Sequence, residues 1–155
     1  MEKETIIQRT LLIDASLEVV WKALTEPELA RLYSSGWMAQ STWKRGAPIV
    51  WKERVEGELF HRAHGTIMTC IPEQRLRFTL WTVGSGLADE PANYTTIDIS
   101  LFEERDGRTR LELWHGDYAG LPEDTKRARE AGKHWVEALV GLKRVSEEQQ
   151  GQRAA

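Results

Sequence analysis

The chain has 155 residues, of which 41% are hydrophobic and 29% are charged, and this composition excludes a disordered chain, a collagen and a membrane span. Lysine and arginine total 21 against 24 acidic residues, and the net charge of -3 argues against a nucleic-acid-binding protein, whose contacts are mostly to phosphate. Seven tryptophans, against three phenylalanines and three tyrosines, indicate a wide core, a cavity lined by large rings or exposed contact surfaces.

Aliphatic and β-branched residues open the chain, and Ser16 is a good N-cap for the segment that follows. Thr25 and Glu28 then stand in the spacing of a capping box, with a proline in the first turn. These signals predict one strand and two short helices, over Ile6–Ile13, Leu17–Leu24 and about Glu26–Tyr33.

Runs of β-forming residues separated by glycine or proline turns fill the middle of the chain. Six strands are expected there, over Trp37–Lys44, Pro48–Val55, Leu59–Ile71, Leu76–Val83, Tyr94–Glu104 and Thr109–Asp117. The longest loop among them, Gly84–Pro91, lies between long strands, and we expect it to border any pocket.

The turn at Asp106-Gly107 allows the register of the last hairpin to be predicted. A three-residue turn with Gly107 in the left-handed conformation places the aliphatic residues of both strands on one face, whereas a two-residue turn divides them between the two faces. An antiparallel sheet with one buried face favours the three-residue turn. It sets His115 opposite Ile97 on the apolar side and turns Trp114 to the other side.

Apolar residues recur with helical period after Pro122, up to about Ser146. At about 1.5 Å per residue this helix would be about 37 Å long, enough to cross several strands. Gly132 and Gly141 within it indicate either close packing or room for a cavity beneath the helix. We expect a single domain over residues 1–148 and a frayed tail over 149–155.

Four segments, in this order, resemble the START-like (Bet v 1-like, SRPBCC) superfamily. They are DASLEVVWKALTEPELARLY, HGTIMTCIPEQRLRFTLW, TTIDISLFEERDGRTRLELWH and GKHWVEALVGLKRV. Within the superfamily the chain is similar to stand-alone bacterial proteins related to the C-terminal domain of the Hsp90 ATPase activator, the AHSA1-like family. The residues Leu32–Trp37 depart from this pattern, because the family often has an aromatic pair and a Gly-Pro there.

The resemblance implies an α+β helix-grip fold, in which a curved seven-stranded antiparallel sheet wraps round a long C-terminal helix and two short helices follow the first strand. It also implies a cavity between the sheet and that helix, holding a small hydrophobic or aromatic molecule. Candidate ligand-binding residues are Trp51, Met68, Phe78, Leu80, Ile97, Ile99, Leu113, His115, Trp135 and Leu139.

His115 is the best polar candidate, because an imidazole on an apolar face needs a partner or a cavity. The alternative is a structural histidine bonded to the backbone near a strand end. His61 and His64 are three residues apart on a predicted strand, so we expect them to point to opposite faces. No cluster has the spacing of a zinc site and no nucleotide motif is complete, so we expect neither a metal nor a cofactor, and no catalytic residue can be assigned.

Three functions compete because fold alone does not decide among them. The first is binding of a small hydrophobic molecule, the second is a polyketide cyclase or aromatase that uses the same cavity, and the third is a chaperone-ATPase regulatory module. The sequence has no counterpart to the activator's separate N-terminal domain, which argues against full activator function. Further expectations are a possible homodimer through the outer sheet face near Trp114, and no nucleic-acid or membrane partner.

The single cysteine, Cys70, cannot form a disulfide within the chain, as is typical of proteins from a reducing cytosol. The first ten residues lack the apolar run of a signal peptide. We therefore expect a cytoplasmic protein.

Overall fold

The structure is a computed structural model and describes residues 4–154. Its strands are β1 (Ile7–Ile13), β2 (Trp37–Gln40), β3 (Pro48–Val55), β4 (Glu58–Ile71), β5 (Arg75–Thr82), β6 (Thr95–Glu103) and β7 (Thr109–Gly116). Its α-helices are α1 (Leu17–Thr25), α2 (Pro27–Ala30) and α3 (Asp124–Ala154), and a 3-10 turn, η1 (Pro91–Asn93), precedes β6. The predicted α+β architecture and its element order are therefore confirmed.

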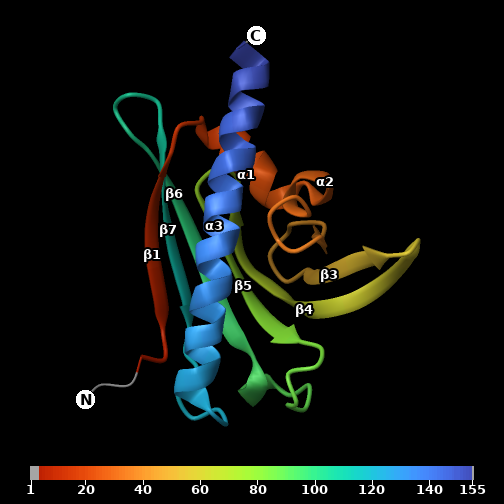
Figure 1. Cartoon of the computed structure of the whole chain (residues 1–155). Coiled ribbons are helices and arrows are strands. Elements are labelled where there is room, and N and C mark those ends of the chain that lie inside the picture. The colour runs from red at the N-terminus through yellow and green to blue at the C-terminus, as the bar shows by residue number, and fades with distance from the viewer. Residues whose placement is uncertain (1–3, 155) are drawn as a thin grey trace.

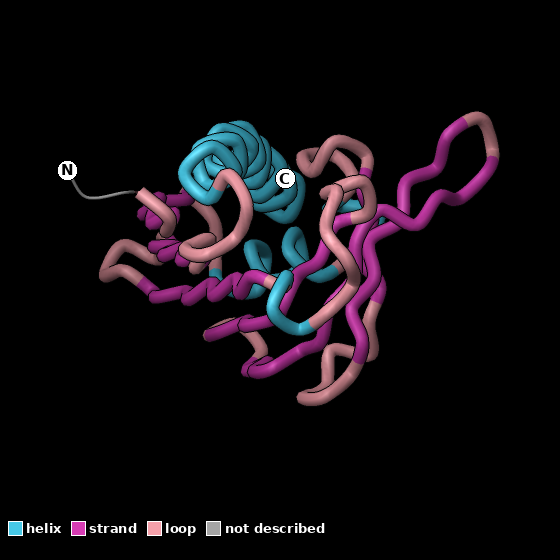
Figure 2. Tube along the Cα trace, turned by 90° about the horizontal axis from the view of Figure 1, so that it is seen from below, coloured by secondary structure: helices cyan, strands magenta, loops and turns pink. Residues whose placement is uncertain are grey.

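All seven strands form one antiparallel sheet in the order β1-β7-β6-β5-β4-β3-β2. Figure 1 shows α3 running along the length of the molecule across one face of this sheet, with α1 and α2 beside its C-terminal half. Figure 2, which looks along α3, shows the strands curving round the helix and the β3–β4 hairpin projecting from the body. The sheet, α1, α2 and α3 thus surround a single interior.

The hairpin between β6 and β7 has the predicted register. Ile97 pairs with His115, Ile99 with Leu113 and Leu101 with Leu111, so the aliphatic residues share the buried face. Gly107 closes the turn with a φ of 84°, in the left-handed region that a glycine adopts without steric cost. The prediction that His115 lies on the inner face is confirmed, because its exposed fraction is 3%.

The C-terminal helix is longer than predicted. It begins at Asp124 because Glu123 has a φ of 53°, outside the helical region. It continues through Ala154, so the tail expected to fray from residue 149 is helical over 149–154. The physical reason is tertiary: the Ser16 amide donates to Gln150 Oε1 at 3.0 Å, and the Arg153 guanidinium donates to both carboxylate oxygens of Glu18.

Two smaller expectations are corrected at the other end of the chain. The helix expected over Glu26–Tyr33 is α-helical only over Pro27–Ala30, and the strand expected to reach Lys44 ends at Gln40. No capping box forms, because the Thr25 hydroxyl donates to the Trp21 carbonyl in the preceding turn.

Within residues 4–154 no helix has the length and apolar character needed to cross a membrane.

Candidate ligand-binding cavity

A cavity of about 550 Å³ lies between the inner face of the sheet and α3. Residues of β2, β3, β5, β6 and β7 form its floor and sides, α3 forms its roof, and α2 with the loop after it lies at one end. The volume falls in the range of small-molecule sites, which are mostly apolar with a few polar groups. This composition follows from the strand pattern, because alternate residues of each strand face inward and these are aliphatic or aromatic.

Most of the residues predicted to bind a ligand line this cavity: Trp51, Phe78, Leu80, Ile97, Ile99, His115, Trp135 and Leu139. Met68 does not, because it is 39% exposed and lies within an irregularity in the pairing of β4 with β5, between Ile67 and Thr69. Leu113 also lies outside the lining, since it is buried in the hydrophobic core opposite Arg9 of β1. The structure thus brings together the predicted strand and helix residues except at these two positions.

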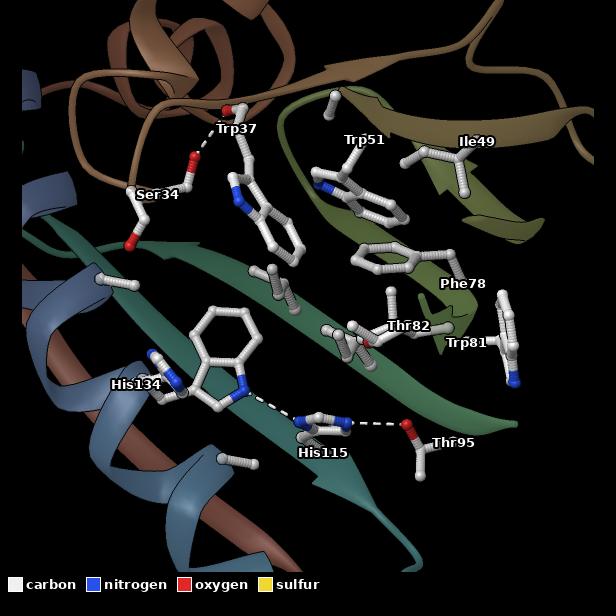
Figure 3. A pocket seen from close by; sticks show the side chains of 18 of the residues that line it. Ser34, Trp37, Ile49, Trp51, Phe78, Trp81, Thr82, Thr95, His115 and His134 are labelled. Atoms are coloured by element: carbon white, nitrogen blue, oxygen red, sulfur yellow. Dashed lines mark hydrogen bonds between the residues drawn. The ribbon is translucent and has the colours of Figure 1, made fainter. Parts of the chain in front are cut away.

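Five of the seven tryptophans belong to the lining: Trp37, Trp43, Trp51, Trp81 and Trp135. The Trp51 and Phe78 rings pack against each other with centroids 5.2 Å apart, and Figure 3 shows them facing Trp37. Such tilted aromatic pairs leave ring edges and faces available to a further ring. The large number of tryptophans in the chain is therefore accounted for mainly by the walls of one cavity.

His115 forms the polar centre of the cavity wall. The Trp135 indole Nε1–H donates to His115 Nδ1 at 2.9 Å, and His115 Nε2 lies 2.9 Å from Thr95 Oγ1 (Figure 3). The Tyr118 hydroxyl lies 3.4 Å from the same Nε2. Thr95, Tyr118 and Trp135 all line the cavity too, so three elements and the loop after β7 meet at this imidazole.

The protonation state of His115 follows from its partners. An indole nitrogen can only donate, so Nδ1 must be the accepting nitrogen and the ring proton must be on Nε2. Burial lowers the pKa of His115 from 6.5 to about 4, which favours the neutral ring. Burial also raises the pKa of the Tyr118 phenol. The cluster is therefore uncharged at neutral pH.

Several lining residues were missed by sequence reasoning. Thr95 has the same parity as Ile97 and Ile99 along β6, so the alternation of the strand could have identified it. Tyr118 lies beyond the end of β7 and Tyr33 beyond the end of α2, where no periodicity applies. Their position depends on tertiary contacts, such as the Tyr33 hydroxyl donating to the Ala23 carbonyl at 2.6 Å.

The loop after β5 borders the cavity, as the sequence suggested. Ser85 and Leu87 contribute to the lining, and Arg127 Nη2 of α3 donates to the Ser85 carbonyl at 3.0 Å. Glu130, His134 and Glu137 of α3 add the charged and polar part of the lining. Figure 3 shows His134 on the helix beside the Trp135 ring that reaches His115.

The expectation for His61 and His64 is wrong. Their side chains lie on the same side of β4, with His61 Nε2 2.7 Å from His64 Nδ1. The reason is an irregularity in the pairing of β3 with β4 between Trp51 and Lys52, which interrupts the alternation of β4 at Arg62. His64 Nε2 in turn lies 2.8 Å from Asp89 Oδ2, so the pair ties the loop to the sheet.

Trp114 lies on the outer face, in a shallow polar groove with Arg77, Asp98 and Glu112. Across the part of the chain that the structure describes, no three histidine, cysteine, aspartate or glutamate side chains gather as metal ligands would.

Comparison with known proteins gives one family and a set of similar folds. Residues 14–147 match the model of the family described as activator of Hsp90 ATPase homolog 1-like protein. The solution structure of ChR145 from Cytophaga hutchinsonii is 30% identical, covers 96% of this chain and 98% of its own, and superposes with a TM-score of 0.73. No curated protein matches the chain.

Two further solved structures share the fold at lower identity. The Aha1 dimer from Colwellia psychrerythraea is 18% identical, with 92% of this chain and 96% of its own covered and a TM-score of 0.68. DynU16, a putative protein in the dynemicin biosynthetic locus, is 16% identical, with a TM-score of 0.70; 95% of this chain and 49% of DynU16 are covered.

Proposed function

The chain belongs to the family of activator of Hsp90 ATPase homolog 1-like proteins, and on that premise we propose that it binds a small hydrophobic or aromatic molecule in the cavity between the sheet and α3. The observation that carries the proposal is the lining itself: a volume of about 550 Å³ walled by aliphatic side chains and five tryptophans, with one neutral polar cluster. Apolar walls of this kind favour a ring system, and a few polar groups orient it.

The state of His115 supports binding over catalysis. A general acid or base needs a ring nitrogen within reach of the reacting group, but both nitrogens of His115 are already engaged by Trp135 and Thr95. The polyketide cyclase-like alternative keeps the same cavity and has the dynemicin-locus protein as a structural neighbour. It would require His115 to exchange one of these protein partners for the substrate.

The chaperone-regulating alternative would use a different part of the molecule, its outer surface. It rests on the family description and on the similarity to the Colwellia psychrerythraea Aha1. It needs an outer surface that contacts another protein, and it gives the cavity no role. Ligand binding confined to the cavity therefore separates it from the first two functions.

The experiment is a titration of ¹⁵N-labelled protein with ethylbenzene, followed through the indole N–H signals of the seven tryptophans. The expected result is saturable shifts of the signals from cavity tryptophans, with the Trp114 signal unchanged. Trp135→Ala should weaken binding about three- to tenfold, because one aromatic wall contact is lost. Trp114→Ala, on the outer face, is the matched control and should bind as the unaltered protein does. If ethylbenzene bound with the same affinity to Trp135→Ala as to the unaltered protein, the proposal would be contradicted.

We further propose a homodimer through the outer sheet face near Trp114. The proposal is supported by the half-buried indole in a groove that holds both Arg77 and Asp98, and by the dimer of the neighbour from Colwellia psychrerythraea. Light scattering after size exclusion should give twice the monomer mass, and Trp114→Glu should shift the protein to the monomer. A monomeric unaltered protein at high concentration would exclude this dimer.

A further inference from the structure

One indole sets the direction of the hydrogen bonds at the polar end of the cavity. The Trp135 N–H is only a donor, so His115 Nδ1 accepts and His115 Nε2 carries the ring proton. That proton points at Thr95 Oγ1, 2.9 Å away, with the Tyr118 oxygen further off at 3.4 Å. His115 is therefore a donor toward both hydroxyl groups and cannot accept a proton from either.

The direction continues through Thr95. Because Thr95 Oγ1 accepts from His115, its own proton can be donated onward, and the Tyr118 oxygen lies within its reach. His115 thus cannot take up the proton of the Tyr118 hydroxyl, because its Nε2 is a donor, and Thr95 Oγ1 already accepts one hydrogen bond from the imidazole.

We propose that Thr95 donates to the Tyr118 oxygen and that Tyr118 donates its own hydroxyl proton to the ligand, so that the cavity selects a neutral apolar or aromatic molecule carrying an acceptor oxygen, such as a ketone. This inference rests on the proposed binding function and adds the chemical class of the ligand. His115 and Thr95 are positioning residues in this arrangement, because they act on the ligand only through Tyr118. A ligand whose polar group is only a donor would meet an opposing donor at this end.

The second tyrosine of the cavity provides a comparison. Tyr33 also belongs to the lining, but its hydroxyl proton is already donated to the Ala23 carbonyl at 2.6 Å. Two tyrosines of one cavity therefore differ in the same property: the Tyr33 proton is used within the protein, and the Tyr118 proton remains for the ligand. The substitution Tyr→Phe at the two positions tests this difference with the same chemical change.

The experiment compares acetophenone with ethylbenzene, two molecules of nearly the same shape that differ in a carbonyl oxygen. Their dissociation constants are measured by the same indole titration. Tyr118→Phe should weaken acetophenone binding about three- to tenfold, the effect of one hydrogen bond, and should change ethylbenzene binding less than about twofold. Tyr33→Phe should change both affinities by the same factor and so leave their ratio unaltered.

The outcomes separate the two proposals. If neither compound binds the unaltered protein in the cavity, the proposed function fails. If both bind and Tyr118→Phe alters them equally, or alters neither, the assignment of the ligand class is overturned while the binding function stands. A second measurement needs no variant: the ¹⁵N spectrum of histidine-labelled protein at neutral pH should show His115 with its proton on Nε2, and a proton on Nδ1 would overturn the inference.

Discussion

His115 is a buried base whose environment accepts only its neutral form. Its ring is 3% exposed, and protonation of Nδ1 would set an N–H against the Trp135 N–H that now donates to it. The parity of β7 was enough to predict the face on which this residue lies. The partners were not predictable, because Trp135 and Tyr118 reach the imidazole from elements whose positions are set by tertiary packing.

The stability of the protein should therefore fall as the pH is lowered through the range in which His115 titrates. The pKa of His115 is about 4 in the folded state, against 6.5 for the ordinary side chain. Between these values the unfolded chain binds more protons than the folded one, so the free energy of unfolding decreases as pH falls. Above about pH 6.5 His115 is neutral in both the folded and the unfolded chain, and the free energy of unfolding has its full value. By about pH 4 it has fallen by about 3 kcal/mol through the titration of this residue.

Urea unfolding of the unaltered protein and of His115→Gln, measured from pH 7.5 to pH 4, checks this expectation. Carboxylates titrate within this range in both proteins, so the difference between their pH profiles isolates His115. The profile of His115→Gln should be flatter by about the amount stated above. If the free energies of unfolding of the two proteins changed in parallel with pH, His115 would not be held in its neutral form in the folded protein.

Met68, His61 and His64 show where prediction from alternation fails. Period-two reasoning assigns faces correctly along an uninterrupted strand, as it did for Ile97, Ile99 and the rest of β6. In β4 the pairing is irregular in two places, near Arg62 and between Ile67 and Thr69. Each irregularity changes the face of the residues beyond it, and no local residue pattern in the sequence marks either position.

At the scale of the element, α3 packs closely against the segment after α2. A Cβ built on Gly141 would lie 2.5 Å from Tyr33 Cβ and 3.2 Å from Tyr33 Cα. Close packing, one of the two explanations given for this glycine, is therefore the right one. Tyr33 lines the cavity, so the absence of a side chain at position 141 helps to set the end wall of the cavity.

Gly141→Ala should destabilise the protein although it improves the helix. Alanine is favoured over glycine within a helix by up to about 1 kcal/mol, but overpacking against fixed backbone atoms costs typically about 1–3 kcal/mol. The expected net loss is about 1–2 kcal/mol in the free energy of unfolding, measured in urea. Gly151→Ala lies in the same helix with nothing within 4 Å of the new methyl group, and it should stabilise by a few tenths to about 1 kcal/mol. A stabilising Gly141→Ala would show that the end wall can move.

The end of α3 illustrates a limit of helical periodicity. The residues after Ser146 are polar and continue no apolar stripe, so pattern alone ends the helix there. The helix persists because its last turns bond to the beginning of the chain: Lys143 to the Leu12 carbonyl of β1, Glu147 to the Asp14 amide, Gln150 to the Ser16 amide and Arg153 to Glu18 of α1. These are contacts between the two ends of the chain, and they cannot be read from either end separately.

At the scale of the whole molecule, the fold class, the element order and most of the cavity wall could be predicted from the sequence. The element order follows from alternating apolar faces, glycine turns and one helical stripe, and most residues predicted to face inward meet in the cavity. The curvature of the sheet round the last helix was implied by the family resemblance. Loop residues such as Tyr118 and Tyr33 could not be assigned, because their positions depend on how the finished elements pack. The polar end of the cavity, which would orient a ligand, is built largely from such contacts.

The position of β1 determines when this molecule can fold during its synthesis. β1 precedes the other six strands of the described chain, yet it pairs in the sheet with β7, the last of them, with Ile7 opposite His115. On the ribosome β1 therefore has no pairing partner until the other strands have emerged, and α3, which roofs the cavity, emerges after all seven strands. Pairings between such distant segments form slowly, because the entropy of closing a long loop is lost before the contacts between the strands contribute any stability. A nascent chain thus has no complete cavity until β7 and α3 have emerged, and a ligand can be enclosed only after that point.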